Sequence, residues 1–92
     1  MKIRGNGSTK QVWINEELLS PEPSQKVVNH STDGFNWGYG GSGPSQMALA
    51  ICLLLYPKQR ALHEYQDFKR EVISNLPIDQ DFEIEIDETK LS

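Results

Sequence analysis

A glycine-rich segment, residues 34–44, constrains the fold of this chain more than any other feature. Five of its eleven residues are glycine, and three, Phe35, Trp37 and Tyr39, are aromatic. Glycine loses more backbone entropy on folding than other residues, so such a cluster indicates positive φ angles or a close approach of the backbone to another group. The segment runs directly into an apolar stretch, which predicts a tightly built loop joined to a buried helix.

The apolar stretch predicts a central helix over residues 44–55. Pro44 suits the first helical position, where no N–H is needed, and Pro57 ends the helix. The residues between them are rich in helix formers and apolar on every side, which is typical of a buried helix. We expect its core residues to include Leu49, Ile51, Leu53 and Leu54.

The region before the glycine-rich segment predicts short strands. Residues 2–4 and 11–14 flank a cluster of turn formers, which is typical of a β-hairpin, and residues 15–17 predict another tight turn before two leucines. Prolines 21 and 23 are expected to interrupt any regular element because neither can donate to a strand ladder. Residues 26–29 are interpreted as one more short strand.

The region after the central helix predicts a second helix over about residues 58–75 and a final strand over residues 82–87. In the helix, apolar residues recur at steps of three or four, and in the strand they alternate with acidic residues. The helical stripe consists of Leu62, Tyr65, Phe68 (or Lys69), Val72 and Leu76. The predicted fold is α+β, a small, mostly antiparallel sheet with two consecutive helices packed on one side, in a single domain of residues 1–92.

Composition narrows the function classes. Nine Lys and Arg against thirteen Asp and Glu give a net charge of −4, which disfavours duplex DNA as a partner. A single cysteine, Cys52, excludes an internal disulfide framework and a multi-cysteine zinc site. The longest apolar run, residues 47–56, is about half of what a membrane span needs. We expect a cytoplasmic protein that binds no membrane and needs no cofactor.

The glycine-rich segment is also the candidate ligand site. The first N–H groups of the helix that follows it would carry a partial positive charge suited to a phosphate or carboxylate, and aromatic rings could stack on a planar base. The alternative, that the aromatics belong to the core, stays open; Trp37 is the best core candidate. The predicted ligand-binding residues are His30, Phe35, Tyr39, Gly40, Gly41, Ser42, Gly43, Ser45 and Gln46.

Two catalytic interpretations of this segment fail. The spacing Gly38-x-Gly40-x-x-Gly43 matches the dinucleotide fingerprint, but a second helix follows where a βαβ unit requires a strand. His30 beside Ser31 lacks the base and orienting group that a nucleophile needs. We expect the side chains of residues 29–31 to hold the glycine-rich segment by hydrogen bonds to its backbone, and we predict no enzyme activity.

The last strand carries a ladder of acidic residues, Asp79, Asp81, Glu83, Glu85, Asp87 and Glu88. The ladder could bind cations or imitate nucleic-acid phosphates. The alternative interpretation is a solvated strand face that also blocks edge-to-edge aggregation.

A long signature around the glycine-rich segment resembles an uncharacterised small domain family of bacteria, archaea, plasmids and phages. The matching residues are Asn29-His30-Ser31, Gly34-Phe35, Trp37-Gly38-Tyr39-Gly40-Gly41-Ser42-Gly43-Pro44, Gln46 and Ala48-Leu49-Ala50, continuing through Ala61, Tyr65, Phe68-Lys69 and Glu71-Val72-Ile73 to Leu76-Pro77. The resemblance covers most of the chain after about Val12 and implies no established activity. Occurrence in phages implies a role in host–virus conflict.

These observations predict a non-enzymatic binding module for a nucleotide-like small molecule, encoded by a phage or mobile element and sequestering a host immune signal in the host cytoplasm. The alternative is an acidic protein-interaction module that inhibits a host nucleic-acid enzyme. Whether the chain forms a homo-oligomer stays open.

Overall fold

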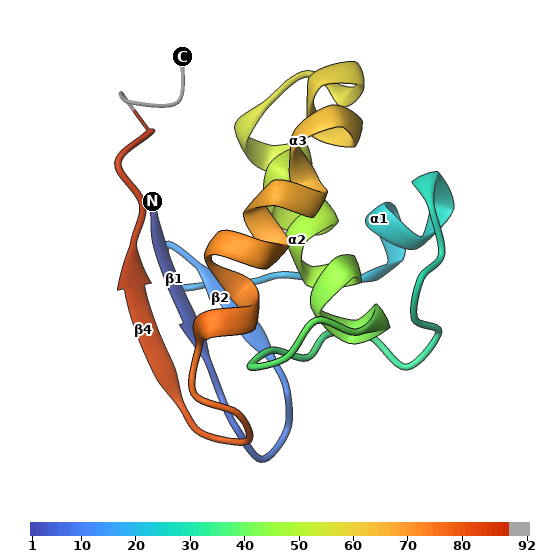
Figure 1. Ribbon diagram of the computed structural model, residues 1–92. Coiled ribbons are helices and arrows are strands. Elements are labelled where there is room, and N and C mark those ends of the chain that lie inside the picture. The colour runs from blue at the N-terminus through green and yellow to red at the C-terminus, as the bar shows by residue number, and fades with distance from the viewer. Residues whose placement is uncertain (89–92) are drawn as a thin grey trace.

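The computed structural model describes residues 1–88 and builds one antiparallel sheet with helices over one of its faces (Figure 1). The strands are β1 (Lys2–Gly5), β2 (Val12–Ile14), β3 (Glu17–Leu18) and β4 (Phe82–Glu85), and they lie in the order β3-β2-β1-β4. The helices are α1 (Glu22–Val27), α2 (Ser42–Leu55), α3 (Lys58–Glu71) and the short 3₁₀ helix η1 (Ile73–Asn75). The predicted α+β fold is confirmed.

The register of the sheet sorts its side chains between two faces. Ile3 pairs with Ile14 on one side and with Ile84 on the other, and this row faces the helices. The alternate residues, among them Arg4 and Trp13, therefore point to the opposite face, which no helix covers. The β2–β3 turn places both Asn15 and Glu16 at positive φ, 50° and 71°, as a type I′ hairpin turn requires.

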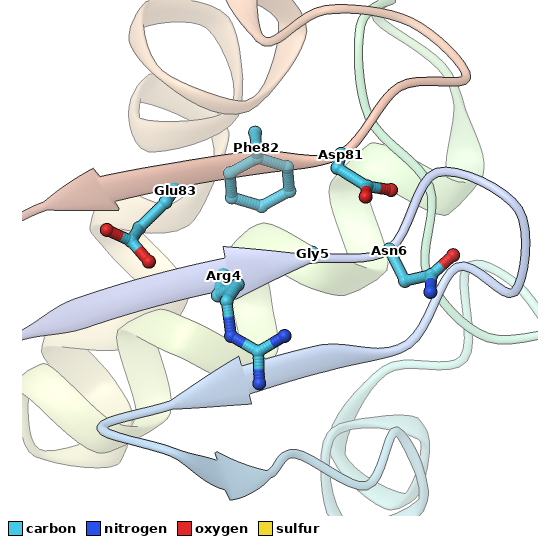
Figure 2. A pocket seen from close by; sticks show the side chains of 6 residues that line it. All are labelled: Arg4, Gly5, Asn6, Asp81, Phe82 and Glu83. Carbon is cyan, nitrogen blue, oxygen red and sulfur yellow. The ribbon is translucent and has the colours of Figure 1, made fainter.

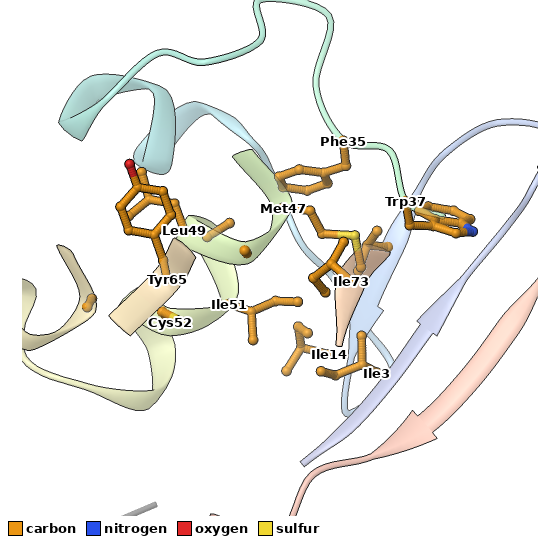
Figure 3. Packing of buried hydrophobic residues seen from close by; sticks show 14 of the residues in the cluster. Ile3, Ile14, Phe35, Trp37, Met47, Leu49, Ile51, Cys52, Tyr65 and Ile73 are labelled. Atoms are coloured by element: carbon orange, nitrogen blue, oxygen red, sulfur yellow. The ribbon is translucent and has the colours of Figure 1, made fainter. Parts of the chain in front are cut away.

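The core lies between α2 and the sheet, and α3 packs against α2 (Figure 3). Met47, Leu49 and Ile51 of α2 are fully buried. The indole of Trp37, also fully buried as predicted, meets the ring of Phe82 edge-on at 4.8 Å between centroids. Burial of large apolar side chains on this scale supplies the main stabilisation of so short a chain.

The predicted strand over residues 26–29 is wrong, because these residues end α1 and continue past it. Pro21 occupies the N-cap of α1 and Pro23 lies in its first turn. The first turn of a helix needs no intrahelical N–H donors, so both prolines begin a helix there instead of preventing one. Ser24 Oγ donates to the Pro21 carbonyl at 2.7 Å, which ties the first turn together.

Helix α2 ends at Leu55 as predicted, but its start and two of its predicted core residues differ from the prediction. It begins at Ser42, so Pro44 occupies the third helical position, still within the turn that needs no donors. Leu54 is not a core residue: it is 53% exposed, and Leu53 is only partly buried. The last turn of α2 extends to the margin of the core, where Leu54 lines a surface hollow.

Helix α3 and strand β4 follow the predicted periodicity with shorter bounds. Helix α3 ends at Glu71, and the chain continues into η1 rather than in one helix to residue 75. Tyr65 of the predicted stripe is buried and three others pack partly against the core, but Leu62 is exposed. Strand β4 ends at Glu85. No helix within residues 1–88 combines the length and apolar character that a membrane span requires.

Candidate functional site

Gln46, inside α2, anchors the chain that leads into the glycine-rich segment. Its Oε1 accepts the backbone N–H groups of His30 at 2.7 Å and Ser31 at 3.0 Å. Its Nε2 donates to Ser24 Oγ at 2.9 Å and to the Val28 carbonyl at 3.1 Å. A glutamine amide offers two donors and one acceptor oxygen, so these four bonds leave no polar atom of this fully buried side chain for a ligand.

The prediction that the side chains of residues 29–31 hold the glycine-rich segment is wrong. The backbone of His30 and Ser31 is held instead, by Gln46 and by Gln25 Nε2, which donates to the Ser31 carbonyl at 2.8 Å. The imidazole Nε2 of His30 lies 2.8 Å from the Tyr65 hydroxyl. His30 therefore connects this segment to α3.

The three aromatics of the glycine-rich segment occupy alternate positions in the sequence, as they would on one face of a strand, but they do not share one face. Phe35 and Trp37 are buried, whereas Tyr39 is 41% exposed. Gly38 breaks the alternation because its φ is +89°, and a Cβ there would lie 2.6 Å from Ile78 Cα. Only glycine suits both the turn and this close approach.

Apart from His30, the predicted ligand-binding residues divide into an exposed tip and a buried base. At the tip, Gly40 and Ser42 are exposed, and Tyr39 packs its ring against Gly41. The N–H groups of Ser42 and Gly43, the first two of α2, have no acceptor within residues 1–88. The buried base consists of Phe35, Gly43, Ser45 and Gln46.

The uncovered face of the sheet carries an aromatic–cation pair at its centre. The Arg4 guanidinium lies over the Trp13 ring, 4.3 Å from its centroid, and Arg4 also pairs with Glu16 at 3.4 Å. Leu18, opposite Trp13 in the register, is 58% exposed. Sequence reasoning placed Trp13 in a strand without assigning it a function; its position between two inward-facing residues, Val12 and Ile14, was the available signal.

A hollow of about 300 Å³ lies beside Arg4 on this face (Figure 2). Its floor is the backbone where Gly5 pairs with Phe82. Gly5 has no side chain because the Phe82 ring occupies the space that a Cβ would need. The lining residues are Arg4, Gly5, Asn6, Asp81, Phe82 and Glu83.

Two further hollows lie along the β3 side of the sheet. The first, about 360 Å³, is lined by Met1, Ile14, Asn15, Glu17, Leu18, Leu19 and Leu54. The second, about 290 Å³, is lined by Thr9, Lys10, Gln11, Leu18, Leu19, Ser20, Pro21, Asp33, Gly34 and Phe35. Of the nine predicted ligand-binding residues, Phe35 alone lines any of these three hollows.

The acidic residues near β4 have electrostatic partners. Asp79 pairs with Lys10 at 2.6 Å, and Glu83 lies 3.6 Å from Lys2 Nζ. The amino-terminal ammonium lies 3.8 Å from Glu85 and 3.5 Å from Glu88. Asp81 accepts the Gly7 N–H at 2.7 Å. By contrast, Glu17 and Asp33 near β3 have no ion pair or side-chain hydrogen bond with any residue of the described part of the chain.

Comparison of the sequence with protein-family models identifies the family of this chain. A family model matches residues 3–91, nearly the whole chain. The chain belongs to DUF6166, a family of unknown function. Comparisons with curated proteins and with solved structures gave no significant match.

The single cysteine of this DUF6166 member has an unreactive environment. Cys52 is buried in α2, and that burial, with a smaller contribution from the Glu64 charge, raises its pKa to about 12. A thiol with this pKa supplies almost no thiolate at neutral pH, and the thiolate is the nucleophile and metal ligand. Within residues 1–88, no three His, Cys, Asp or Glu side chains gather in a way that could hold a metal ion.

Proposed function

We propose that the chain is a non-enzymatic binding module that recognises a protein partner through the uncovered face of its sheet. The observation that carries this proposal is the Arg4–Trp13 stack beside exposed Leu18, on a face that no helix covers. Tryptophan and arginine dominate the energetics of protein interfaces because they combine a large contact area with directed polar groups. The Trp13 indole N–H has no acceptor within residues 1–88, so it is available to a partner.

The surroundings of the stack support the same proposal. The hollow beside Arg4 has the dimensions to receive a partner side chain. Exposed ion pairs lie beside the stack: Lys2 Nζ pairs with Glu16 at 2.9 Å and with Glu83 at 3.6 Å. An aromatic centre with a charged, solvated rim is the usual anatomy of a protein interface.

Trp13→Ala tests this proposal. Affinity purification from the host cell identifies a partner, and titration of that purified partner then compares the wild type with Trp13→Ala and with the exposed α3 variant His63→Ala. We expect Trp13→Ala to weaken binding roughly 30-fold or more and His63→Ala to leave it unchanged, with both folds intact by circular dichroism. Equal affinity of wild type and Trp13→Ala would refute the proposal.

A nucleotide-like small molecule at the tip of the glycine-rich segment is the second candidate. Three features favour it. The Tyr39 ring is exposed, a side chain at Gly40 would meet no other atom, and the first N–H groups of α2 have no acceptor within residues 1–88. This candidate includes the role suggested by occurrence in phages, the sequestration of a host immune signal. It ranks second because the described hollows lie elsewhere.

Calorimetry against linear and cyclic nucleotides separates the two candidates. Binding that Tyr39→Ala abolishes and Trp13→Ala preserves would establish the second candidate. No nucleotide binding below millimolar concentration would remove it. Inhibition of a nucleic-acid enzyme by the acidic strand has less support than either, since the carboxylates near β4 are paired within the chain.

A further inference from the structure

The free edge of the sheet at β3, here called the β3 edge (residues 17–20), presents unpaired backbone groups. The Leu19 N–H donates to the Val12 carbonyl at 2.8 Å, so the backbone groups of Leu19 point toward β2. Because these groups alternate along a strand, the N–H and C=O of Leu18 point away from the sheet. No residue of the described chain pairs with them, and an unpaired edge of this kind is a template for another strand.

Two hollows flank the β3 edge along its length. One reaches Ile14 and Leu54 beside the Glu17 end, and the other reaches Phe35 beside the Ser20 end. Leu18 and Leu19 line both hollows. A strand laid along this edge would send alternate side chains toward the same side of the sheet, where apolar side chains could enter these hollows.

The charges at this edge define the partner further. Glu17 lines the first hollow and Asp33 lines the second, and neither has a cationic partner within residues 1–88. A carboxylate without a partner beside an apolar hollow favours lysine or arginine in whatever binds there.

We propose that the β3 edge takes an extended segment of a partner protein by strand addition, with apolar side chains at alternate positions and basic residues between or beside them. The inference rests on the proposed function, since it names the segment that such a partner would contribute. A second copy of the chain is the less favoured occupant, because antiparallel pairing of two β3 edges would bring their Glu17 carboxylates together.

A short synthetic peptide that alternates leucine and lysine tests the inference on the full chain. One control peptide has glutamate in place of lysine, and another has N-methyl groups on the amides along one edge. We expect the lysine peptide to shift the amide NMR signals of residues 17–20, the glutamate peptide to bind at least about fivefold more weakly, and the N-methylated peptide to bind undetectably.

Charge reversal provides the matched variant. The double change Glu17→Lys with Asp33→Lys alters two exposed side chains, so the fold should persist and the preference should invert toward the glutamate peptide. Shifts confined to another surface, equal binding of all three peptides, or a concentration-dependent dimer joined through residues 17–20 would each overturn the inference. If the peptides fail while Trp13→Ala still loses the partner, strand addition is wrong and the proposed function stands. A normal affinity of Trp13→Ala would instead remove the proposed function, whatever the peptides do.

Discussion

The two edge strands of the sheet, β3 and β4, differ in the exposed residues and the paired charges that they carry. At β4, Phe82 is buried against Trp37, and the exposed Glu83 and Glu85 carboxylates find cations from the start of the chain. At β3, both residues are exposed: Leu18 is apolar, and the Glu17 carboxylate has no cation among residues 1–88. Charged residues protect a sheet edge against unwanted pairing. Because β4 exposes two carboxylates and β3 exposes one carboxylate and a leucine, β4 is the better protected edge.

The difference shows that the number of charges in a strand does not tell how many of them lack partners. The acidic ladder is the most conspicuous charge pattern in the sequence, yet it is bound by the amino terminus. The Met1 ammonium donates to the Ile86 carbonyl at 2.7 Å, and the Ile86 N–H donates to the Met1 carbonyl at 2.7 Å. These bonds continue the β1–β4 pairing past Glu85. Near β3, Glu17 and Asp33 have no such partner within residues 1–88.

Truncation at each edge should give the largest contrast. Phe82→Ala removes a buried ring and should lower the free energy of unfolding by about 3–5 kcal/mol through the cavity it leaves. Leu18→Ala removes an exposed side chain and should change it by no more than about 0.5 kcal/mol. Urea denaturation measures both. Similar losses at the two positions would contradict the distinction between the edges.

A double-mutant cycle between Gly5 and Phe82 should give the next largest effect. Gly5→Ala forces a Cβ into the space of the Phe82 ring and should cost about 1–3 kcal/mol. In the Phe82→Ala background the same change meets no ring and should cost little, so the two changes are strongly non-additive. Additive losses in denaturation would show that the ring does not set the requirement for glycine.

Lys10→Met should have a smaller effect on the protected side. Lys10 pairs with Asp79 at 2.6 Å and lies 5.0 Å from the centroid of the Trp37 ring. Losing both contacts should lower the free energy of unfolding by roughly 1 kcal/mol, and part of that loss should vanish in high salt. The exposed Lys58 supplies the control variant, Lys58→Met. Equal stability of the two variants at low salt would contradict these contacts.

The smallest effect concerns Glu16, in the turn between β2 and β3. The hydrogen bond and charge of Lys2 lower the pKa of Glu16 below its ordinary value. A carboxylate with a lowered folded-state pKa stabilises the fold above its unfolded pKa, and that contribution disappears as the pH falls through the folded pKa. An NMR titration should find the low pKa in the wild type and its return toward the ordinary value in Lys2→Met. An unchanged Glu16 titration in that variant would assign the shift to another cause.

Much of the fold follows from local patterns that the sequence displays. Alternation in residues 82–86 and the three-to-four spacing around Tyr65 locate β4 and α3, because each pattern reflects one buried face. The β-branched and aromatic residues within 11–14, which follow a cluster of turn formers, locate β2. Helix α1 escaped prediction because two prolines argue against regular structure everywhere except in the first turn of a helix. Whether a proline lies in that first turn depends on where the helix begins.

The candidate site was less predictable, because its features depend on contacts between distant parts of the chain. Gln46 reads as a polar residue free to bind a ligand, and only the fold brings Ser24, Val28 and the backbone of residues 30–31 to its amide. Likewise, which acidic residues are neutralised depends on strand pairing between opposite ends of the chain. Trp13 stands on the uncovered face because the helices cover one side only.

The most direct test of the account compares one photo-crosslinking residue at two positions, Leu18 on the β3 edge and Glu85 on the β4 edge. Each variant is expressed in the host cell, irradiated and analysed for covalently attached protein, with urea denaturation confirming equal stability. We expect position 18 to capture a partner and position 85 to capture none. Capture at position 85 with none at position 18 would contradict it.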